Sequence, residues 1–330
     1  MELSLDISRS AMLQYLQDRN WMEPYEEVLR LEKPGEGNMN VVVRVVGDTR
    51  NLILKQSRAF VNKYPQIAAP IERIGVERRF YALAASDPEL RKYLPWVVGF
   101  DAKNHLMVLE DLGKGADYTF VYKKDEQMTA EELTAAADFL KVLHEQKFDS
   151  ETVNTFPDNL ALRKLNHEHL FVYPYMEDNG FDLDTIQPGL QALAMTYKTD
   201  SVLKRKVSAL GEIYLASGNA LLHGDDYPGS WRRVNAGFKV IDPEFCFFGP
   251  AEYDLGVMLA HLRMAQQPET DIEKVVEKYG GEINAGFVAQ IEGMEVLRRI
   301  IGLAQLPLDL SLGEKEALLK LAAKKITSNA

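Results

Sequence analysis

The sequence predicts an α+β fold of two lobes, in which a small antiparallel β lobe precedes a larger and mainly α lobe. Strand-like runs separated by turn-forming residues are concentrated in the first third of the chain. Most of the remainder places apolar residues at helical spacing, and 330 residues with 46% hydrophobic content suffice for two separate cores. We expect the N-terminal lobe to span 1–111 and the C-terminal lobe to span 112–330.

The first lobe is expected to begin with a helix and to continue as a meander of strands. Ala11, Met12, Leu13 and Leu16 have helical spacing, which predicts a helix over 9–20. Turn-forming clusters separate the following runs, so neighbouring strands should pair antiparallel. The expected strands are 27–31, 41–46, 52–55, 95–100 and 105–109, with a second helix over 69–86.

The second lobe is expected to be helical from residue 129 onward. Leu133, Phe139, Leu140 and Leu143 have helical spacing there, and similar patterns continue to the C-terminus. Only Leu221-Leu222 and the run 238–241 resemble strands. No internal repeat or low-complexity tract interrupts this pattern.

Composition excludes several classes of partner. A formal net charge of -11 argues against a nucleic acid or an anionic membrane surface as partner. The single cysteine, Cys246, excludes an internal disulfide framework and a cysteine-based zinc cluster, which fits a reducing compartment. No apolar stretch is long enough to span a bilayer, and the first 20 residues lack the apolar run of a signal peptide. We therefore expect a soluble, cytoplasmic protein.

Two acidic segments carry the strongest chemical signal. Asp225 follows Leu221-Leu222, and Asp242 follows the run 238–241, so a hairpin of these two strands would bring both carboxylates to one point. Phosphoryl transfer requires such a pair: one carboxylate orients the acceptor hydroxyl and takes its proton, and the other holds magnesium. We assign the first role to Asp225 and the second to Asp242. Glu244 points to the same side of an extended segment as Asp242 and is the candidate second metal ligand.

These segments resemble a known superfamily. His223-Gly224-Asp225 with Ile241-Asp242-Pro243 is similar to the catalytic pair of aminoglycoside phosphotransferases and choline kinases, which implies a bilobal protein-kinase-like fold. Within that group the closer similarity is to methylthioribose kinases. The supporting segments are Gly229-Ser230, the run 241–250, the run 35–40, Leu54-Lys55-Gln56 and the run 298–304.

The resemblance implies a kinase that uses ATP and Mg²⁺ and phosphorylates a hydroxyl of a small metabolite, with 5-methylthioribose as the first candidate. Its first lobe would bind ATP and its second would hold the catalytic and substrate-binding residues. Dimers occur among methylthioribose kinases, so the resemblance also allows a homodimer.

It further implies roles for particular residues. Lys55 would contact the ATP phosphates and Glu77 would hold the lysine in place, with Glu72 as a rival. The remaining implied roles are phosphate contacts by the loop with Gly35, Gly37, Asn38 and Asn40, adenine contacts by the hinge from Glu110 to Leu112, metal binding by Ser230, and substrate contacts by Arg298, Arg299, Asp226 and Tyr227.

One departure from the family leaves the acceptor open. Methylthioribose kinases read Leu-His-Thr where this chain has Asp226-Tyr227-Pro228, beside the acceptor. A choline-type or aminoglycoside-type kinase is one alternative, because Asp226, Tyr227 and Trp231 would suit a quaternary ammonium. A nucleotide-binding pseudokinase that acts through a partner is another. A protein kinase ranks last, since Asp-Phe-Gly and Ala-Pro-Glu segments are missing.

Structural interpretations compete with these functional ones. Lys55 would then be an exposed strand lysine, and Glu77 one charge on a solvated helix face that includes Arg73. Arg298 and Arg299 would be a helix surface or a buried salt-bridged pair. For two other residues we favour structural roles: His223 would support its loop, and Asp254 would cap a helix or support the loop that carries Asp225.

Overall fold

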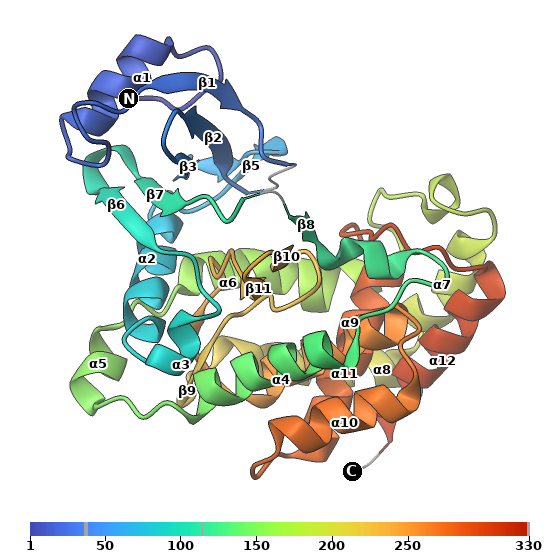
Figure 1. Ribbon diagram of the computed structural model, residues 1–330. Coiled ribbons are helices and arrows are strands. Elements are labelled where there is room, and N and C mark those ends of the chain that lie inside the picture. The colour runs from blue at the N-terminus through green and yellow to red at the C-terminus, as the bar shows by residue number, and fades with distance from the viewer. Residues whose placement is uncertain (36–38, 114, 329–330) are drawn as a thin grey trace. The chain divides into compact units, whose positions relative to one another are not determined.

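The structure, a computed structural model, describes residues 1–35, 39–113 and 115–328. The chain divides into two compact units (Figure 1). The first unit is Met1–Ala116 with Arg233–Glu244, and the second is Asp117–Arg232 with Phe245–Ala330. The expected boundary between residues 111 and 112 lies a few residues before the point where the chain first passes from the first unit to the second, between Ala116 and Asp117. The return of 233–244 to the first unit was not expected. It depends on contacts between residues far apart in the sequence, which local sequence patterns do not reveal.

A five-stranded antiparallel sheet forms the centre of the first unit, in the order β1-β2-β3-β7-β6. Gly47 closes the turn between β2 and β3, where a Cβ would lie 2.3 Å from the carbonyl oxygen of Arg50. All five strands expected for this lobe are present. They are β1 (Val28–Glu32), β2 (Val41–Gly47), β3 (Asn51–Gln56), β6 (Val97–Asp101) and β7 (Leu106–Glu110).

Helix α1 (Arg9–Gln17) supplies part of the core of this unit. The Ser8 side chain caps its start by accepting the Ala11 N–H at 3.2 Å. Met12 and Leu16 are buried in one apolar cluster with residues of β2 and β3. The helix ends before residue 20, because Asn20 adopts a positive φ of 56°.

The remaining helices of the first unit are α2 (Arg73–Ala84) and α3 (Pro88–Arg91). Helix α2 begins later than the expected 69, since Pro70 disfavours helical conformation at Ala69. The strands β4 (Phe60–Val61) and β5 (Tyr64–Ala68) pair antiparallel and were not expected.

The returning segment of the first unit contains β11 (Gly237–Val240). The Val240 N–H donates to the Tyr93 carbonyl oxygen at 2.8 Å, which attaches this segment to the unit. β11 belongs to a three-stranded sheet of order β11-β10-β8, with β10 (Trp231–Val234) and β8 (Ala116–Asp117).

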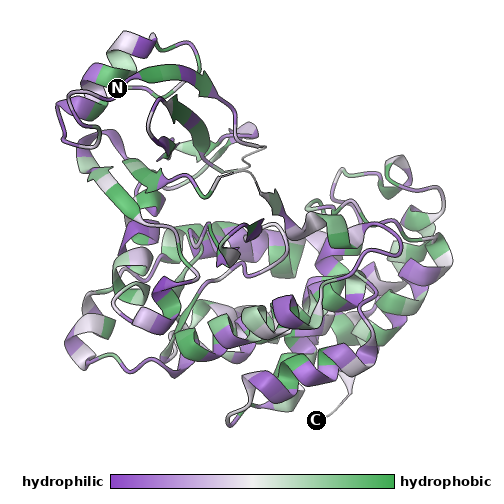
Figure 2. Cartoon of the chain, in the orientation of Figure 1, coloured by the Kyte–Doolittle hydropathy of each residue, from purple (hydrophilic) through white to green (hydrophobic). Residues whose placement is uncertain are grey.

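The second unit is mainly helical, as expected. Hydrophobic and hydrophilic residues alternate along its helices (Figure 2). Two glycines allow helices to pack closely. A Cβ at Gly256 of α9 would lie 2.7 Å from Ile291 of α11, and a Cβ at Gly293 of α11 would lie 2.5 Å from the Ala322 carbonyl oxygen of α12. The helices are α4 (Ala130–Glu145), α5 (Ser150–Thr155), α6 (Leu160–His167), α7 (Leu190–Lys198), α8 (Ser201–Leu215), α9 (Glu252–Met264), α10 (Glu269–Tyr279), α11 (Ala285–Ile301) and α12 (Leu312–Thr327).

The expected hairpin between the two short strands that precede Asp225 and Asp242 is wrong. Strand β9 (Ala220–Leu222) pairs instead with β12 (Phe247–Gly249), with Leu222 opposite Phe247. β12 supplies buried aromatic side chains to this pairing, whereas β11 lies in the other unit. A three-residue strand gives too short a pattern for its partner to be chosen from sequence.

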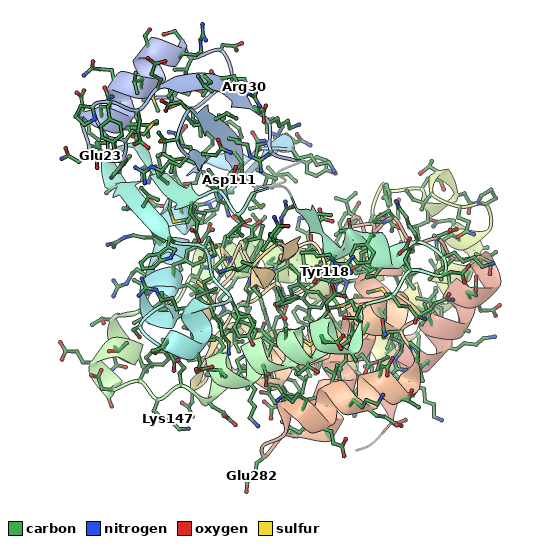
Figure 3. All side chains as sticks on the ribbon, in the orientation of Figure 1. Glu23, Arg30, Asp111, Tyr118, Lys147 and Glu282 are labelled. Atoms are coloured by element: carbon green, nitrogen blue, oxygen red, sulfur yellow. The ribbon has the colours of Figure 1, made fainter. Side chains whose placement is uncertain are left out.

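In the second unit, many charged side chains lie on the surface and many aromatic side chains lie in the interior. Lys147 and Glu282 are exposed, whereas Tyr118 is buried and its hydroxyl donates to Glu132 at 2.9 Å (Figure 3). None of the helices in the described ranges combines the length and the apolar character that crossing a membrane requires.

Candidate active site

Lys55 lies on β3 at the centre of a buried ionic cluster in the first unit. Its side chain is 7% exposed, and its Nζ lies 2.7 Å from Oε2 of Glu77 on α2. The same Nζ also contacts Oδ1 of Asp242. The interpretation of Lys55 as an exposed strand lysine is therefore wrong.

One face of α2 supplies three members of this region. Arg73, Glu77 and Tyr81 follow each other at one helical turn, so they share a face, and all three are buried. The alternative that Arg73 and Glu77 lie on a solvated face is wrong. Glu72, the rival of Glu77, is an exposed residue at the start of the helix.

The backbone at Asp242 has an unusual conformation with a positive φ of 69°. The Asp242 N–H donates to the hydroxyl oxygen of Tyr81 at 3.2 Å, and the side chain is 46% exposed. Strained residues of this kind are frequent at functional sites. Tyr81 thus positions the backbone of the expected metal ligand.

Glu244 is buried beside two polar residues of the first unit. Its Oε2 accepts from Nδ2 of Asn40 at 2.8 Å and lies 3.7 Å from Nε of Arg73. Arg73 also donates to the carbonyl oxygen of Met39 at 2.7 Å. Arg73 therefore connects Glu244 to the segment that precedes β2.

Burial and mutual repulsion change the pKa values of this cluster. Burial, assisted by Asp242, raises the pKa of Glu244 to about 8. Burial also raises the pKa of Glu77 to about 7, although Lys55 opposes the change. For Lys55, burial disfavours the charge, but attraction by Asp242, Glu77 and Glu244 prevails and raises its pKa well above the ordinary value. A lysine cation at this place is strongly favoured.

The oxygen atoms of this cluster fit a magnesium ion. In the described part of the chain no group of three or more His, Cys, Asp or Glu side chains converges as a metal site. Magnesium, however, is commonly bound by one or two carboxylates together with phosphates and water. Asp242 and Glu244 provide two carboxylates, and the buried Oδ1 of Asn40 has no hydrogen-bond partner among the described residues.

The expected phosphate loop and hinge are placed only in part. Gly37 and Asn38 lie outside the described residues, and a Cβ at Gly35 would meet nothing within 4 Å. Glu110 ends β7, where its N–H donates to the Trp96 carbonyl oxygen at 2.9 Å and its carboxylate accepts the Trp96 N–H at 3.0 Å. Leu112 follows in irregular, half-buried backbone.

In the second unit, Asp225 lies in the loop after β9, which Asp254 of α9 holds. The buried carboxylate of Asp254 accepts the His223 N–H at 2.6 Å and the Gly224 N–H at 3.0 Å. Gly224 has a φ of +84°, and a Cβ there would lie 2.3 Å from the Phe245 carbonyl oxygen. His223 Nδ1 accepts the Asp225 N–H at 3.3 Å. Both His223 and Asp254 support the loop.

Arg298 and Arg299 on α11 face Asp225. Oδ1 of Asp225 lies 3.6 Å from Nη2 of Arg298 and 3.4 Å from Nη2 of Arg299. Burial raises the pKa of Asp225 even though both arginines oppose the change. A carboxylate with a raised pKa is a stronger proton acceptor, as a general base requires.

Glu295 holds both arginines from behind and was not anticipated from the sequence. This fully buried carboxylate accepts from Nε of Arg298 at 2.5 Å and from Nε of Arg299 at 2.8 Å. Nε2 of His261 lies 2.9 Å from it, and Nδ1 of His261 lies 2.6 Å from the Tyr122 hydroxyl. The arginines are therefore a buried salt-bridged pair that also faces Asp225.

The three other residues expected near substrate or metal have local partners. Asp226 is fully buried and accepts from Nε1 of Trp231 at 2.8 Å. Tyr227 is partly buried, with the Arg299 guanidinium 4.7 Å from its ring centroid. The Ser230 hydroxyl donates to the Asp225 carbonyl oxygen at 2.9 Å.

Two positioning residues of the first unit also escaped the sequence analysis. Arg73 and Tyr81 stand one helical turn before and after Glu77, so the spacing on α2 contained a usable signal. A charged residue at helical spacing from an expected site residue on the same face is a candidate member of that site.

The fold and these clusters define the class of the protein. Residues 30–286 match the model of the phosphotransferase enzyme family, and the chain belongs to that family. It is similar to the methylthioribose kinase of Exiguobacterium sibiricum, with 28% identity over 257 residues that cover 74% of this chain and 64% of that protein. The chain thus spans less than two thirds of the length of this curated relative. The expected resemblance is confirmed.

Solved structures confirm the expected protein-kinase-like fold. A spectinomycin phosphotransferase in complex with ADP and spectinomycin has a TM-score of 0.56 at 12% identity, covering 97% of this chain and 98% of that one. The choline kinase of Streptococcus pneumoniae has a TM-score of 0.52 at 12% identity, covering 98% and 100%. At these identities the similarity concerns the fold alone.

Proposed function

We propose that the protein is an ATP-dependent phosphotransferase that phosphorylates a hydroxyl of a small metabolite. The observation that carries this proposal is the buried Lys55 ammonium held by Glu77 and Asp242. A fixed ammonium beside carboxylates that can hold magnesium is the arrangement that neutralises nucleotide phosphates. Membership of the phosphotransferase family and similarity to a methylthioribose kinase support the same activity.

Each residue then has a defined role. Lys55 binds the ATP phosphates, and Glu77 and Tyr81 position Lys55 and Asp242. Asp242 and Glu244 hold magnesium, which neutralises phosphate charge when bound. Asp225 orients the acceptor hydroxyl and takes its proton. Gly35, Glu110 and Leu112 keep their expected nucleotide contacts as part of this proposal, and the buried reduced Cys246 is consistent with a cytoplasmic enzyme.

The surroundings of Asp225 favour a neutral, oxygen-rich acceptor over a cation. Arg298 and Arg299 lie within 4 Å of this carboxylate and are also paired with Glu295, so two guanidinium groups balance two carboxylates. The site therefore lacks the excess negative charge that would attract choline or an aminoglycoside. The aromatic cage that choline needs is also poorly supported, because Trp231 and Asp226 are fully buried and bound to each other. The arginine pair donates hydrogen bonds that suit sugar hydroxyls, so 5-methylthioribose remains the first candidate.

Two residues of the loop 226–228 make internal hydrogen bonds. Asp226 is occupied with Trp231, and the Pro228 carbonyl oxygen accepts the Tyr118 N–H at 2.9 Å. The departure from the family sequence at Asp226 therefore serves an internal contact with Trp231, which weakens its use as the motive for a pseudokinase.

The test is release of ADP from Mg-ATP in a coupled assay with methylthioribose, ribose, choline or an aminoglycoside as acceptor. We expect turnover with a neutral sugar, and a loss of at least about a hundredfold for Asp225→Asn. Asp178→Asn, at an exposed aspartate of the same unit, is the matched control and should keep full activity. Failure of all four acceptors to stimulate ADP release would favour a pseudokinase.

A further inference from the structure

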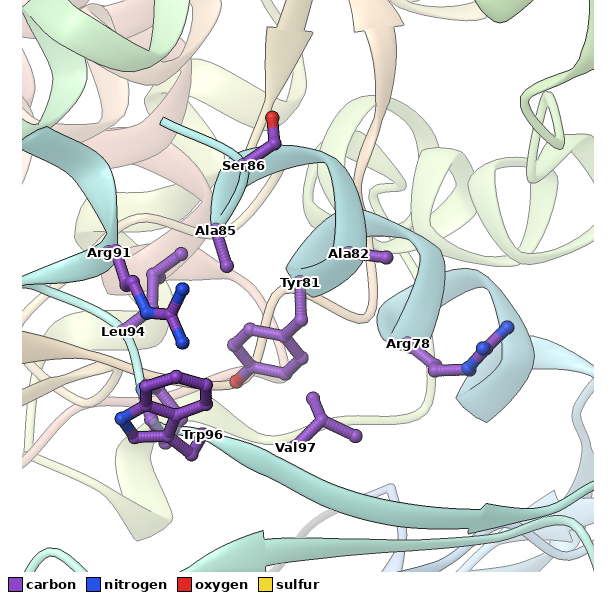
Figure 4. A pocket seen from close by; sticks show the side chains of 10 residues that line it. Arg78, Tyr81, Ala82, Ala85, Ser86, Arg91, Leu94, Trp96 and Val97 are labelled. Atoms are coloured by element: carbon purple, nitrogen blue, oxygen red, sulfur yellow. The ribbon is translucent and has the colours of Figure 1, made fainter. Parts of the chain in front are cut away.

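A cavity of about 340 Å³ lies in the first unit between α2, α3 and the start of β6, apart from the cluster around Lys55 (Figure 4). All of its lining residues belong to that unit. Leu94, Val97 and the ring of Tyr81 form apolar walls. The size lies at the lower end of the range for small-molecule pockets.

Two arginines and an exposed tryptophan give this cavity a specific chemical character. The Arg91 guanidinium lies 3.3 Å from the ring centroid of Trp96, which is 55% exposed. Arg78 lies at the other end, 5.4 Å from the Phe100 ring (Figure 4).

Among the residues that the structure describes, both guanidinium groups lack an acidic partner. Within the described ranges, neither Arg78 nor Arg91 forms an ion pair with a carboxylate. The glutamate of α3, Glu89, pairs with Lys92 at 2.6 Å instead. In a chain with a net charge of -11, two arginines left unpaired at one cavity form a local positive site.

We propose that this cavity is an effector site for a small organic anion. Its carboxylate or phosphate group pairs with Arg91, because the guanidinium fork matches the geometry of both anions. Its flat apolar part lies against Tyr81 and Val97, beside the exposed edge of Trp96. Arg78 adds long-range attraction from the opposite end.

The cavity is connected to residues that the proposed function assigns to nucleotide and metal. Tyr81 lines it with its ring, and the hydroxyl of the same residue accepts the Asp242 N–H. The backbone of Trp96 exchanges hydrogen bonds with Glu110. The binding of an anion does not rest on the proposed function, but its effector role does, because a ligand that shifts Tyr81 or Trp96 changes nucleotide affinity only if these contacts matter.

Binding is tested by titrating phenyl phosphate and, separately, benzoate while following tryptophan fluorescence. We expect saturable quenching by at least one of the two, which Trp96→Phe removes, and no saturation with the neutral analogue benzyl alcohol. Arg91→Gln should weaken binding by at least about tenfold, the loss expected for one charged hydrogen bond. The matched control is Arg79→Gln, an exposed arginine of α2 outside the cavity, which should leave binding unchanged.

Absence of saturation with both anions, or equal affinity in Arg91→Gln and Arg79→Gln, would overturn the site. The effector role is tested by calorimetric titration of Mg-ADP with and without the bound anion. We expect a changed affinity in the wild type and a smaller change in Tyr81→Phe. An unchanged affinity would overturn the effector role, and so would a change that persists in Arg91→Gln, because it would come from competition at the nucleotide site.

Discussion

Lys55 forms ion pairs with Glu77 and Asp242, and these two carboxylates together with Glu244 keep it charged in spite of its burial. Attraction by Asp242, Glu77 and Glu244 outweighs the cost of removing the ammonium from water. Glu77 is fully buried on a regular helix, and its Oε2 lies 2.7 Å from Nζ of Lys55. We therefore expect Glu77 to determine where the ammonium lies when phosphates approach.

Replacement of Glu77 by Gln tests this arrangement at the scale of one residue. The amide keeps the shape but removes the charge that holds Lys55, so kcat/KM for ATP should fall about tenfold or more. Steady-state kinetics at saturating acceptor measure the effect. Glu72→Gln, an exposed glutamate next to the same helix, should behave as wild type. Equal kinetics of the two variants would contradict the role of Glu77.

The sequence allowed the prediction of this residue pair because a strand lysine followed by a helix glutamate is a local pattern. The contact of Lys55 with Glu77 was expected and is present. Glu295 was not expected, because nothing in a sequence distinguishes a buried glutamate from a surface one before the packing of its helix is known. The proposed roles of these residues toward ATP and substrate remain predictions.

At the scale of elements, α9 positions the loop that follows β9. Its Asp254 supports that loop directly, because both carboxylate oxygens accept backbone N–H groups of the loop. His144 on α4 lies 3.3 Å from Oδ2 of the same carboxylate. Helix α9 directly, and α4 through Asp254, therefore support the backbone immediately before Asp225.

Asp254→Asn should disrupt this support. The amide has one acceptor oxygen in place of two, so one buried N–H of the loop loses its partner, which costs about 1–3 kcal/mol. We expect a lower urea midpoint together with a reduced kcat. Glu273→Gln, on the exposed face of α10, is the control and should leave both values unchanged. An Asp254→Asn protein with the midpoint and kcat of the wild type would refute the assignment.

Long elements were predictable, whereas their ends and the shortest strands were not. Helix-like patterns located α1 and α2, and strand-like runs, several of them bounded by turn-forming residues, located the five strands of the first sheet. The β9 partner was misassigned because three apolar residues carry no register information, and tertiary packing selects β12. Hydrophobic spacing alone predicted that α2 begins too early and that α1 ends too late. Pro70 and the positive φ at Asn20 account for the shorter helices.

At the scale of the molecule, the division into two units was predicted but the return of 233–244 to the first unit was not. Contacts far apart in sequence decide this return, such as that of Val240 with Tyr93. In the second unit, a buried polar network joins α9 and α11 to Tyr122 through His261 and Glu295. Such a network links global stability to pH.

Burial lowers the pKa of His261 to about 4, against an ordinary value of 6.5, although the hydrogen bond with Glu295 opposes the change. Between these two pKa values the unfolded chain binds the proton more readily, so stability should fall as pH decreases through this window. His261→Gln should remove a contribution of about 2 kcal/mol to the loss between pH 7 and 5. Urea unfolding at several pH values measures it.

The neighbours of His261 define the range in which this test is clean. Arg299, Tyr227, Tyr122 and Glu295 surround the ring, and Glu295 alone among them titrates at acid pH. Burial opposes its charge, but the arginines hold its pKa well below the ordinary 4.5, so its own effect appears only at lower pH. His167→Gln, at a partly exposed histidine of α6, is the control, and identical pH slopes for the two variants would contradict the prediction.

The most direct test of the proposed activity follows the transferred phosphoryl group itself. Phosphorus NMR of Mg-ATP incubated with the protein and methylthioribose, ribose or choline distinguishes a phosphate ester from free phosphate. We predict a new phosphomonoester signal with a neutral sugar, little or none with choline, and none with Asp225→Asn. Release of inorganic phosphate alone, an unchanged ATP spectrum with every acceptor, or preferential phosphorylation of choline would contradict a phosphotransferase whose arginine pair selects a neutral acceptor.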